Sequence, residues 1–165
     1  MNERRTLPFR LNCEGYFFDS NGNMLAKDSG KGYIIFPGGG VNESETIEEG
    51  MVRETFEETG AVVENVKKVG TLKIKWSPQW AKTEKQRMRY EKFQGDEMHF
   101  FTGIIKEFKT NGSSEEDFWE GSKLLSLKEV IKQMKTKKKI EGDEKEYRKM
   151  QFRLLKEIEK GLYDR

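Results

Sequence analysis

The chain has 165 residues, which is enough for one domain with a proper core and short for two. Its 31 basic and 29 acidic residues nearly cancel to a formal charge of +2, a balance that favours neither a nucleic-acid-binding protein nor a strongly acidic one. Aromatic residues make up 12% of the chain, which argues against disorder. The single cysteine, Cys13, excludes an intramolecular disulfide and fits a small buried side chain in a reducing compartment.

Membrane and export signals are not evident in the sequence. The segment "MNERRTLPFR" carries basic residues without the apolar run of a signal peptide. No apolar stretch approaches the length that spans a bilayer. We therefore expect a cytoplasmic protein that does not enter a membrane.

The first forty residues indicate β structure. Alternating and aromatic-rich segments predict strands, and an Asn-Gly pair predicts a hairpin turn between the first two. A short apolar strand then stops at a proline, and a glycine turn follows. In chain order these features are Leu11 to Phe18, the turn at Asn21-Gly22, Met24 to Lys27, Tyr33 to Phe36, and Gly38 to Gly40.

The clearest helix signal follows the glycines. Thr46 and Glu49 have the spacing of a capping box, in which the side chains of the first and fourth residues satisfy each other's backbone N–H groups. Gly60 lies where a helix-ending glycine is expected. Met51 and Phe56 supply apolar surface for packing against a sheet. We therefore predict a helix between Thr46 and Gly60.

The rest of the chain continues the mixed pattern. Alternation over Ala61 to Trp76 predicts two strands around a turn, and the polar segment from Ser77 to Gly95 reads as a long loop or insertion. The pattern ends with three further elements: a strand over Glu97 to Phe108, a helix over Leu127 to Met134, and a C-terminal amphipathic helix at about 143–160. Met51, Met98 and Met150 are expected in the core. This order predicts a single domain, 1–165, of the α+β or mixed α/β sandwich class.

Three carboxylates on the predicted helix need an explanation. Glu54, Glu57 and Glu58 are spaced so that they share one helix face, where like charges repel. They also lie in the last turns, where the helix dipole disfavours anions. A Mg²⁺ ion would explain them, because it takes oxygen ligands, and the neighbouring glycines allow the backbone to approach an ion closely. The spacing alone fits a solvated acidic helix equally well.

The complete pattern resembles the signature of the Nudix hydrolase family, G-x5-E-x7-R-E-U-x-E-E-x-G-U, in which U is a bulky aliphatic residue. Thr55 and Ala61 depart from the pattern at the two aliphatic positions and concern helix packing rather than metal binding. All fixed positions are in register at Gly39, Glu45, Arg53, Glu54, Glu57, Glu58 and Gly60.

The resemblance implies a fold and a set of roles. It implies an α/β/α sandwich around a mixed β-sheet, with the signature forming a loop, a helix and a loop. It implies that Glu54, Glu57 and Glu58 bind Mg²⁺ or Mn²⁺, with the Gly38 carbonyl as a further ligand. Arg53 would orient the glutamates, and Glu45, with Gly39 and Gly60, would be structural. One more acid often contributes from outside the signature, and the candidates here are Glu97, Glu115 and Glu116.

The resemblance also implies a reaction, the hydrolysis of a diphosphate linked to another group. We expect water to attack phosphorus directly, with Glu54 or Glu57 as the base and Arg53 beside them. The substrate would be a nucleoside triphosphate or a nucleoside diphosphate derivative. The alternatives are hydrolysis of ADP-ribose, a dinucleoside polyphosphate or an RNA 5′ end, and a non-catalytic nucleotide-sensing module. The intact carboxylates argue against the sensor, and a related isomerase activity needs cysteine chemistry that Cys13 does not obviously supply.

Substrate recognition is expected outside the signature. Trp76, Trp80, Arg87 and Arg89 are the candidates, because aromatic faces stack on bases and cations meet phosphates. The alternative is that the aromatic residues anchor a long loop on the core. The basic run Lys135 to Lys139 either attracts RNA or forms a solvated linker, of which the linker is the simpler interpretation. The sequence leaves the oligomeric state open.

Overall fold

The computed structural model describes residues 3–109, 118–121, 123–136 and 144–163. A six-stranded mixed sheet has helices on both faces, and a two-stranded sheet lies beside it. The elements are the short 3-10 helix η1 (Glu3–Thr6), β1 (Phe9–Phe18), β2 (Asn23–Leu25), β3 (Lys27–Asp28), β4 (Ile34–Ile35), β5 (Gly38–Gly40), α1 (Ile47–Thr59), β6 (Ala61–Lys75), the 3-10 helix η2 (Pro78–Trp80), α2 (Glu84–Lys92), β7 (Gly95–Phe108), β8 (Leu124–Ser126), α3 (Leu127–Thr136) and α4 (Lys145–Glu159). This arrangement confirms the predicted mixed α/β class.

Strand β1 is the centre of the sheet. It pairs in parallel with β7 along its whole length, from Phe9 opposite Gly95 to Phe18 opposite Ile104. Its other edge pairs antiparallel with β5 and then with β2, which follows the predicted hairpin turn at Asn21-Gly22. The sheet order is β6-β7-β1-β2-β8, with β5 also on β1.

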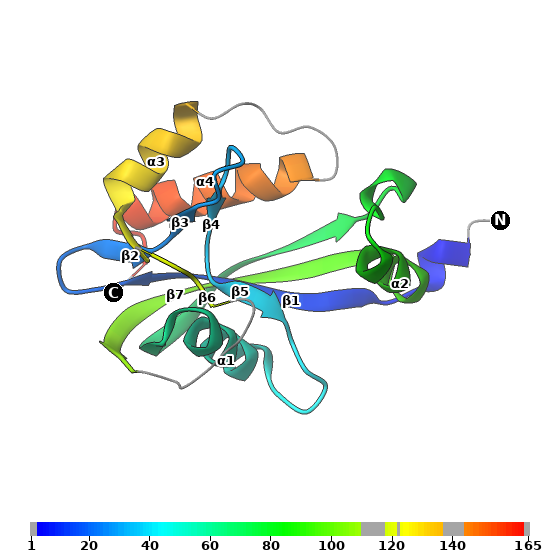
Figure 1. Cartoon of the computed structure of the whole chain (residues 1–165), viewed down its shortest axis with the longest axis horizontal. Helices are drawn as coiled ribbons and strands as arrows, with labels where there is room; N and C mark the ends of the chain where they lie inside the picture. The colour runs from blue at the N-terminus through cyan, green and yellow to red at the C-terminus, as the bar shows by residue number, and fades with distance from the viewer. Residues whose placement is uncertain (1–2, 110–117, 122, 137–143, 164–165) are drawn as a thin grey trace.

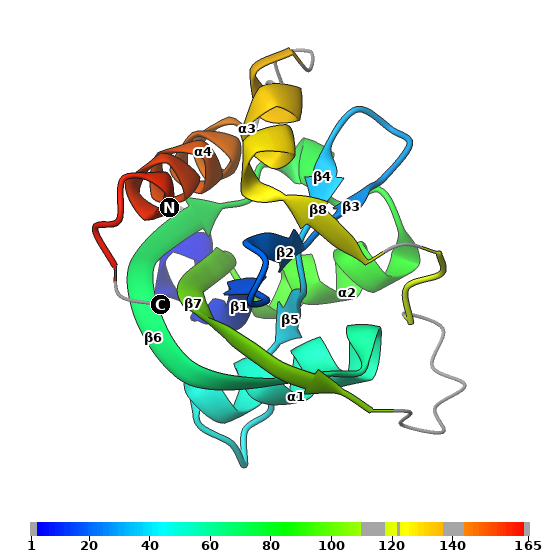
Figure 2. The same ribbon diagram turned by 90° about the vertical axis from the view of Figure 1, so that its left-hand side faces the viewer.

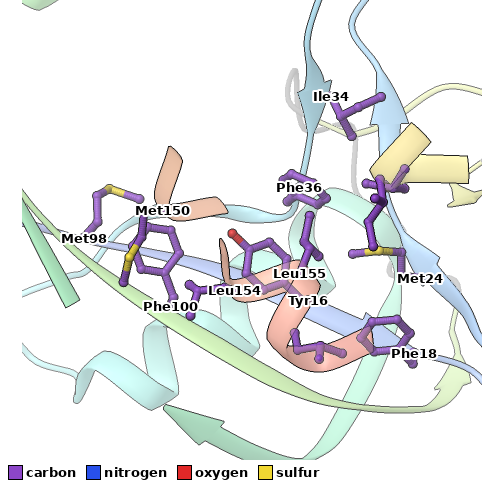
Figure 3. Close-up of a cluster of buried hydrophobic side chains, with 14 residues drawn as sticks. Tyr16, Phe18, Met24, Ile34, Phe36, Met98, Phe100, Met150, Leu154 and Leu155 are labelled. Atoms are coloured by element: carbon purple, nitrogen blue, oxygen red, sulfur yellow. The ribbon is translucent and has the colours of Figure 1, made fainter. Parts of the chain in front are cut away.

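The alternation of side chains along β1 builds two separate cores. Tyr16 and Phe18 face α3 and α4, where they join the larger cluster of buried side chains drawn in Figure 3. Cys13 and Phe17 point to the other face and pack with Met51 of α1. Figure 1 shows α1 on one side of the sheet and α3 and α4 on the other. The expected burial of Cys13, Met51, Met98 and Met150 is confirmed.

Three local predictions are wrong. The segment 61–76 is not two strands around a turn but the single strand β6, which Figure 2 shows curving around the sheet. Register shifts along its pairing with β7, and a positive φ of 54° at Asn65, absorb the irregular alternation as bulges. The segment 77–95 contains η2 and the helix α2. The predicted glycine turn is the short strand β5.

Helix α2 has a capping box but no apolar stripe. Thr83 accepts a hydrogen bond from the Gln86 N–H at 3.1 Å, and the Gln86 side chain accepts one from the Thr83 N–H. None of its residues is buried, and its sequence lacks the apolar periodicity that identifies most helices. The Thr-x-x-Gln spacing was the available signal. None of the described helices is both long and apolar enough to cross a membrane.

Helix α4 is held to the sheet by a buried carboxyl group. Glu14 of β1 is 4% exposed, and its Oε2 accepts hydrogen bonds from Tyr16 Oη at 2.7 Å and Gln151 Nε2 at 2.8 Å. Tyr147 Oη donates to Oε1 of the same carboxyl group. Burial raises the pKa of Glu14, although these three hydrogen bonds and the nearby charge of Arg148 oppose the rise.

This shift predicts a pH dependence of stability. Because the native pKa of Glu14 is raised above its ordinary value of 4.5, the native state retains a proton that the unfolded chain releases. The contribution of Glu14 to the free energy of unfolding is therefore complete below pH 4.5, its ordinary pKa. This contribution is lost as pH rises through the native pKa. We expect Glu14→Gln, which does not titrate, to flatten the fall in the free energy of unfolding as pH rises above 4.5.

Urea unfolding of both proteins across that range measures the difference. Asp96, which is partly buried, also has a raised pKa, but it is present in both proteins, so the comparison isolates Glu14. Identical pH profiles for the wild type and the variant would contradict this assignment.

Candidate active site around the glycine strand

Helix α1 forms as the sequence predicts, and its ends fix the direction of the carboxylates. The Thr46 side chain accepts a hydrogen bond from the Glu49 N–H at 3.1 Å, and Glu49 Oε1 accepts one from the Thr46 N–H at 2.8 Å. At the other end Gly60 adopts a left-handed conformation with φ of 78°, and its N–H donates to the Phe56 carbonyl. Because a Cβ at Gly60 would also lie 2.7 Å from the Lys109 carbonyl oxygen, only glycine fits there without strain.

Arg53 is the centre of the site. Its Nη2 donates to Glu45 Oε1 at 2.7 Å, and its Nε donates to Glu45 Oε2 at 3.0 Å. Its Nη1 lies 3.1 Å from both Glu54 Oε1 and Glu57 Oε2. Its Nη2 also donates to the Gly40 carbonyl at 3.0 Å. One guanidinium group therefore connects the loop, the helix and strand β5.

Glu45 is the strongest partner of that guanidinium. The hydrogen bonds from Arg53 lower the pKa of Glu45, and the backbone N–H of Asn42 adds a further one at 2.9 Å. Through Asn42, Glu45 also fixes the loop that enters α1. The predicted roles of Arg53 and Glu45, to orient glutamates and to brace the loop, stay predictions, for which these contacts supply the geometry.

Strand β5 presents backbone groups to the carboxylates. β5 pairs antiparallel with β1, and the backbone of Pro37 and of Val41 is hydrogen-bonded to β1. Because hydrogen-bonded positions alternate along such a pair, Gly39 also faces β1. The N–H and carbonyl groups of Gly38 and Gly40 therefore point away from β1. The Gly38 N–H donates to Glu58 Oε1 at 2.8 Å. The pairing thus directs the carbonyl that was predicted as a metal ligand to the outer edge of β5.

Gly39 is required for a different reason. A Cβ atom at this position would lie 2.5 Å from Glu54 Cδ and 2.7 Å from both carboxylate oxygens. The absence of a side chain therefore makes the space in which the Glu54 carboxylate lies against the strand. Behind it, Cys13 Sγ donates to the Gly39 carbonyl at 3.4 Å, and burial raises the pKa of Cys13 to about 12. Cys13 is therefore a protonated, packed side chain and not a nucleophile.

The residues fit a hard divalent cation in their chemistry. Glu54, Glu57 and Glu58 offer only oxygen atoms, and the glycine strand adds backbone carbonyl groups. Within the described residues, no three carboxylate, imidazole or thiolate groups converge as a formed metal site. Instead Arg53 and the Gly38 N–H occupy these glutamates, so the same oxygens that would serve as ligands are already fixed beside the glycines.

Of the three candidate acids outside the signature, the structure describes only Glu97. Glu97 Oε2 lies 2.6 Å from His99 Nε2, and Glu97 Oε1 lies 3.8 Å from Lys73 Nζ, so Glu97 is part of a polar group on β6 and β7. Glu115 and Glu116 lie outside the described residues, as does most of the run from Lys135 to Lys139.

The structure brings together three of the four predicted substrate-binding residues. Trp76 and Trp80 stack on each other, with ring centroids 3.8 Å apart and planes 7° from parallel. Trp76 is buried, and its Nε1 donates to Asp96 Oδ2 at 3.1 Å. Arg89 is half-buried and interacts electrostatically with the same aspartate.

Arg87 is exposed, and its Nη1 donates to the carbonyl of Lys82, which precedes the same helix. Arg10 is not among the predicted site residues, yet its guanidinium lies where a side chain at Gly40 would be. No sequence signal connects Arg10 with a glycine thirty residues away, because only the pairing of β1 with β5 brings them together.

Comparison with known proteins identifies the family. The NUDIX domain profile matches residues 14–149, and no curated protein matches. Among solved structures, a Nudix hydrolase from Nitrosomonas europaea has a TM-score of 0.54 and 14% identity, covering 77% of this chain and 78% of its own. A MutT Nudix hydrolase from Burkholderia pseudomallei has a TM-score of 0.47 and 18% identity, with coverages of 72% and 84%. A point mutant of a pyrophosphohydrolase from Bacillus subtilis has a TM-score of 0.46 and 20% identity, with coverages of 76% and 65%.

The likeness to the Nitrosomonas europaea structure concerns the fold alone, because the sequence identity is low. The family profile spans most of the chain and includes the whole site around Arg53. Nudix enzymes act on phosphoric anhydrides and generally use divalent metal ions. The chain belongs to the Nudix hydrolase family.

Proposed function

We propose that this chain is a Mg²⁺-dependent pyrophosphohydrolase that cleaves the diphosphate linkage of a nucleoside triphosphate or a nucleoside diphosphate derivative. The observation that carries the proposal is the convergence on Arg53 of Glu45, Glu54, Glu57 and the Gly40 carbonyl, with Glu58 fixed on the Gly38 N–H. Every fixed position of the signature therefore either belongs to the group of contacts around Arg53 and the glycine strand, or, as Gly60 does, ends helix α1.

The residues that would hold the cation are Glu54, Glu57, Glu58 and the Gly38 carbonyl; Mn²⁺ is an equivalent choice for such oxygen ligands. When bound, the ion would neutralise phosphate oxygens and lower the pKa of an attached water molecule. The remaining work belongs to the protein, which must position the substrate and remove a proton.

Two glutamates differ in their access to water. The side chain of Glu57 is 38% exposed, whereas that of Glu54 is 18% exposed and lies against Gly39. We assign the base to Glu57, because a base must reach the attacking water. Its hydrogen bond to Arg53 keeps the carboxylate oriented, and no covalent enzyme intermediate is required.

Glu57→Gln tests the proposed reaction. This substitution keeps the shape of the side chain and removes its charge, so we expect turnover with Mg²⁺ to fall by about 100-fold or more while the protein stays folded. The assay uses nucleoside triphosphates, ADP-ribose, dinucleoside polyphosphates and 5′-triphosphate RNA, with identification of the products. The matched control is Glu48→Gln, an exposed glutamate in the first turn of the same helix.

Near-normal turnover by Glu57→Gln would rule out this site assignment. Chelation of the divalent cation should abolish hydrolysis of every substrate that the wild type cleaves. If the wild type hydrolyses none of these substrates, the result would instead favour a nucleotide-sensing role.

Gly39→Ala tests the position of Glu54. The added methyl group would overlap the Glu54 carboxylate and force it away from β5, and displacement of a catalytic group by about 1 Å can cost about 100-fold in rate. We therefore expect a large fall in kcat with little change in melting temperature. Ser44→Ala, an exposed change in the loop before the same helix, is the control. Full activity of a folded Gly39→Ala protein would show that Glu54 does not need its observed place.

A further inference from the structure

A second charged group lies at the end of the sheet, around Asp96 of β7. Asp96 Oδ1 lies 3.7 Å from Arg10 Nη1 and accepts a hydrogen bond from Asn12 Nδ2 at 3.5 Å. Its Oδ2 accepts one from Trp76 Nε1 at 3.1 Å. Arg89 of α2 interacts electrostatically with Asp96 and with Arg10. We refer to Arg10, Arg89 and Asp96 as the arginine pair and its aspartate.

This group carries one more positive charge than negative. The side chains of Arg10 and Asp96 are only 20% and 18% exposed, so water screens the charges incompletely. Burial and the nearby charge of Arg10 lower the pKa of Arg89, whereas the charge of Asp96 opposes that change. Because guanidinium groups do not give up their proton in proteins, the excess charge cannot be removed by deprotonation. An anion beside the two arginines would remove it.

The arginine pair adjoins the candidate active site. The Arg10 guanidinium fills the space beside Gly40, and the carbonyl of the same residue accepts the hydrogen bond from Arg53. The preceding residue, Gly39, lies against the Glu54 carboxylate. Because successive residues of a strand face opposite sides of a sheet, Glu54 and Arg10 lie on opposite faces of β5, beside the edge at which Arg53 contacts the Gly40 carbonyl. A polyphosphate chain that passes this edge would meet both groups.

We propose that Arg10 and Arg89 bind a terminal phosphate of the substrate, next to the diphosphate that the glutamates and their cation hold. Guanidinium groups suit this task, because their planar fork of N–H donors matches phosphate oxygens. The inference rests on the proposed function and makes it narrower. It selects substrates with three linked phosphates, such as a nucleoside triphosphate, over nucleoside diphosphates whose second substituent is uncharged.

The competing explanation is that the arginines only hold α2 on the sheet through Asp96. The two explanations differ in what Asp96 does to an anion. In a purely structural group, Asp96→Asn loosens α2 and confers no affinity for anions. In a phosphate site, the carboxylate repels the ligand, so the isosteric Asp96→Asn should strengthen binding while its side-chain oxygen still accepts from Trp76.

The binding experiment uses inorganic tripolyphosphate and calorimetry with a chelator present. Without a divalent cation the glutamates repel the probe, so the remaining affinity reports the arginine pair. We expect Arg10→Gln and Arg89→Gln each to weaken binding about tenfold, the size expected for loss of a charged hydrogen bond. Lys85→Gln, which removes an exposed positive charge from the same helix, should change it little. Asp96→Asn should tighten binding.

A wild type that does not bind millimolar tripolyphosphate, or arginine variants that bind as the wild type does, would overturn the proposal. Near-ultraviolet circular dichroism checks that each variant is folded, and Arg89→Gln gives a second reading if Arg10→Gln is not. Where hydrolysis is observed, Arg89→Gln should raise KM for nucleoside triphosphates and leave KM for nucleoside diphosphate sugars unchanged; equal effects on both substrates also count against it. Because the calorimetry needs no metal and no turnover, its result is independent of whether the glutamates catalyse hydrolysis.

Discussion

The guanidinium group of Arg53 is the interaction on which the site depends. It supplies donors to Glu45, Glu54 and Glu57 and to the Gly40 carbonyl, so groups from a loop, a helix and a strand share one cation. Three carboxylates grouped without it would repel one another at the end of a helix whose dipole already disfavours them. Lysine could not replace it, because a single ammonium group cannot present donors in several fixed directions.

The glycine strand is the complementary half of this arrangement. Its lack of side chains places the backbone against β1 on one edge and leaves room for Glu54 and Arg10 on either side. The candidate site therefore contains two close approaches that any larger residue would prevent. Because β5 is paired with the central strand, the backbone groups that face the glutamates are held as rigidly as the sheet itself.

The predictability of each part follows from the range of the interactions that form it. The capping box at Thr46, the left-handed Gly60 and the shared face of the three glutamates are local, so the sequence alone predicted them correctly. The continuity of β6 depends on its pairing with β7, which accommodates bulges that look like a turn in the sequence. Helix α2 was missed because it has no buried side. The placement of Arg10 beside Gly40 is a product of strand pairing, which no local pattern encodes.

The parallel pairing of β1 with β7 also has a consequence for how the chain folds. Phe9 lies opposite Gly95, and every other residue of β1 has a partner equally far along the chain. Closing so long a loop costs entropy before the contacts repay it, and topologies rich in such pairings fold slowly. During synthesis, helix α1 and its glutamates leave the ribosome well before β7 does. The nascent chain must therefore carry its acidic helix without the completed sheet until more than half of the protein has been made.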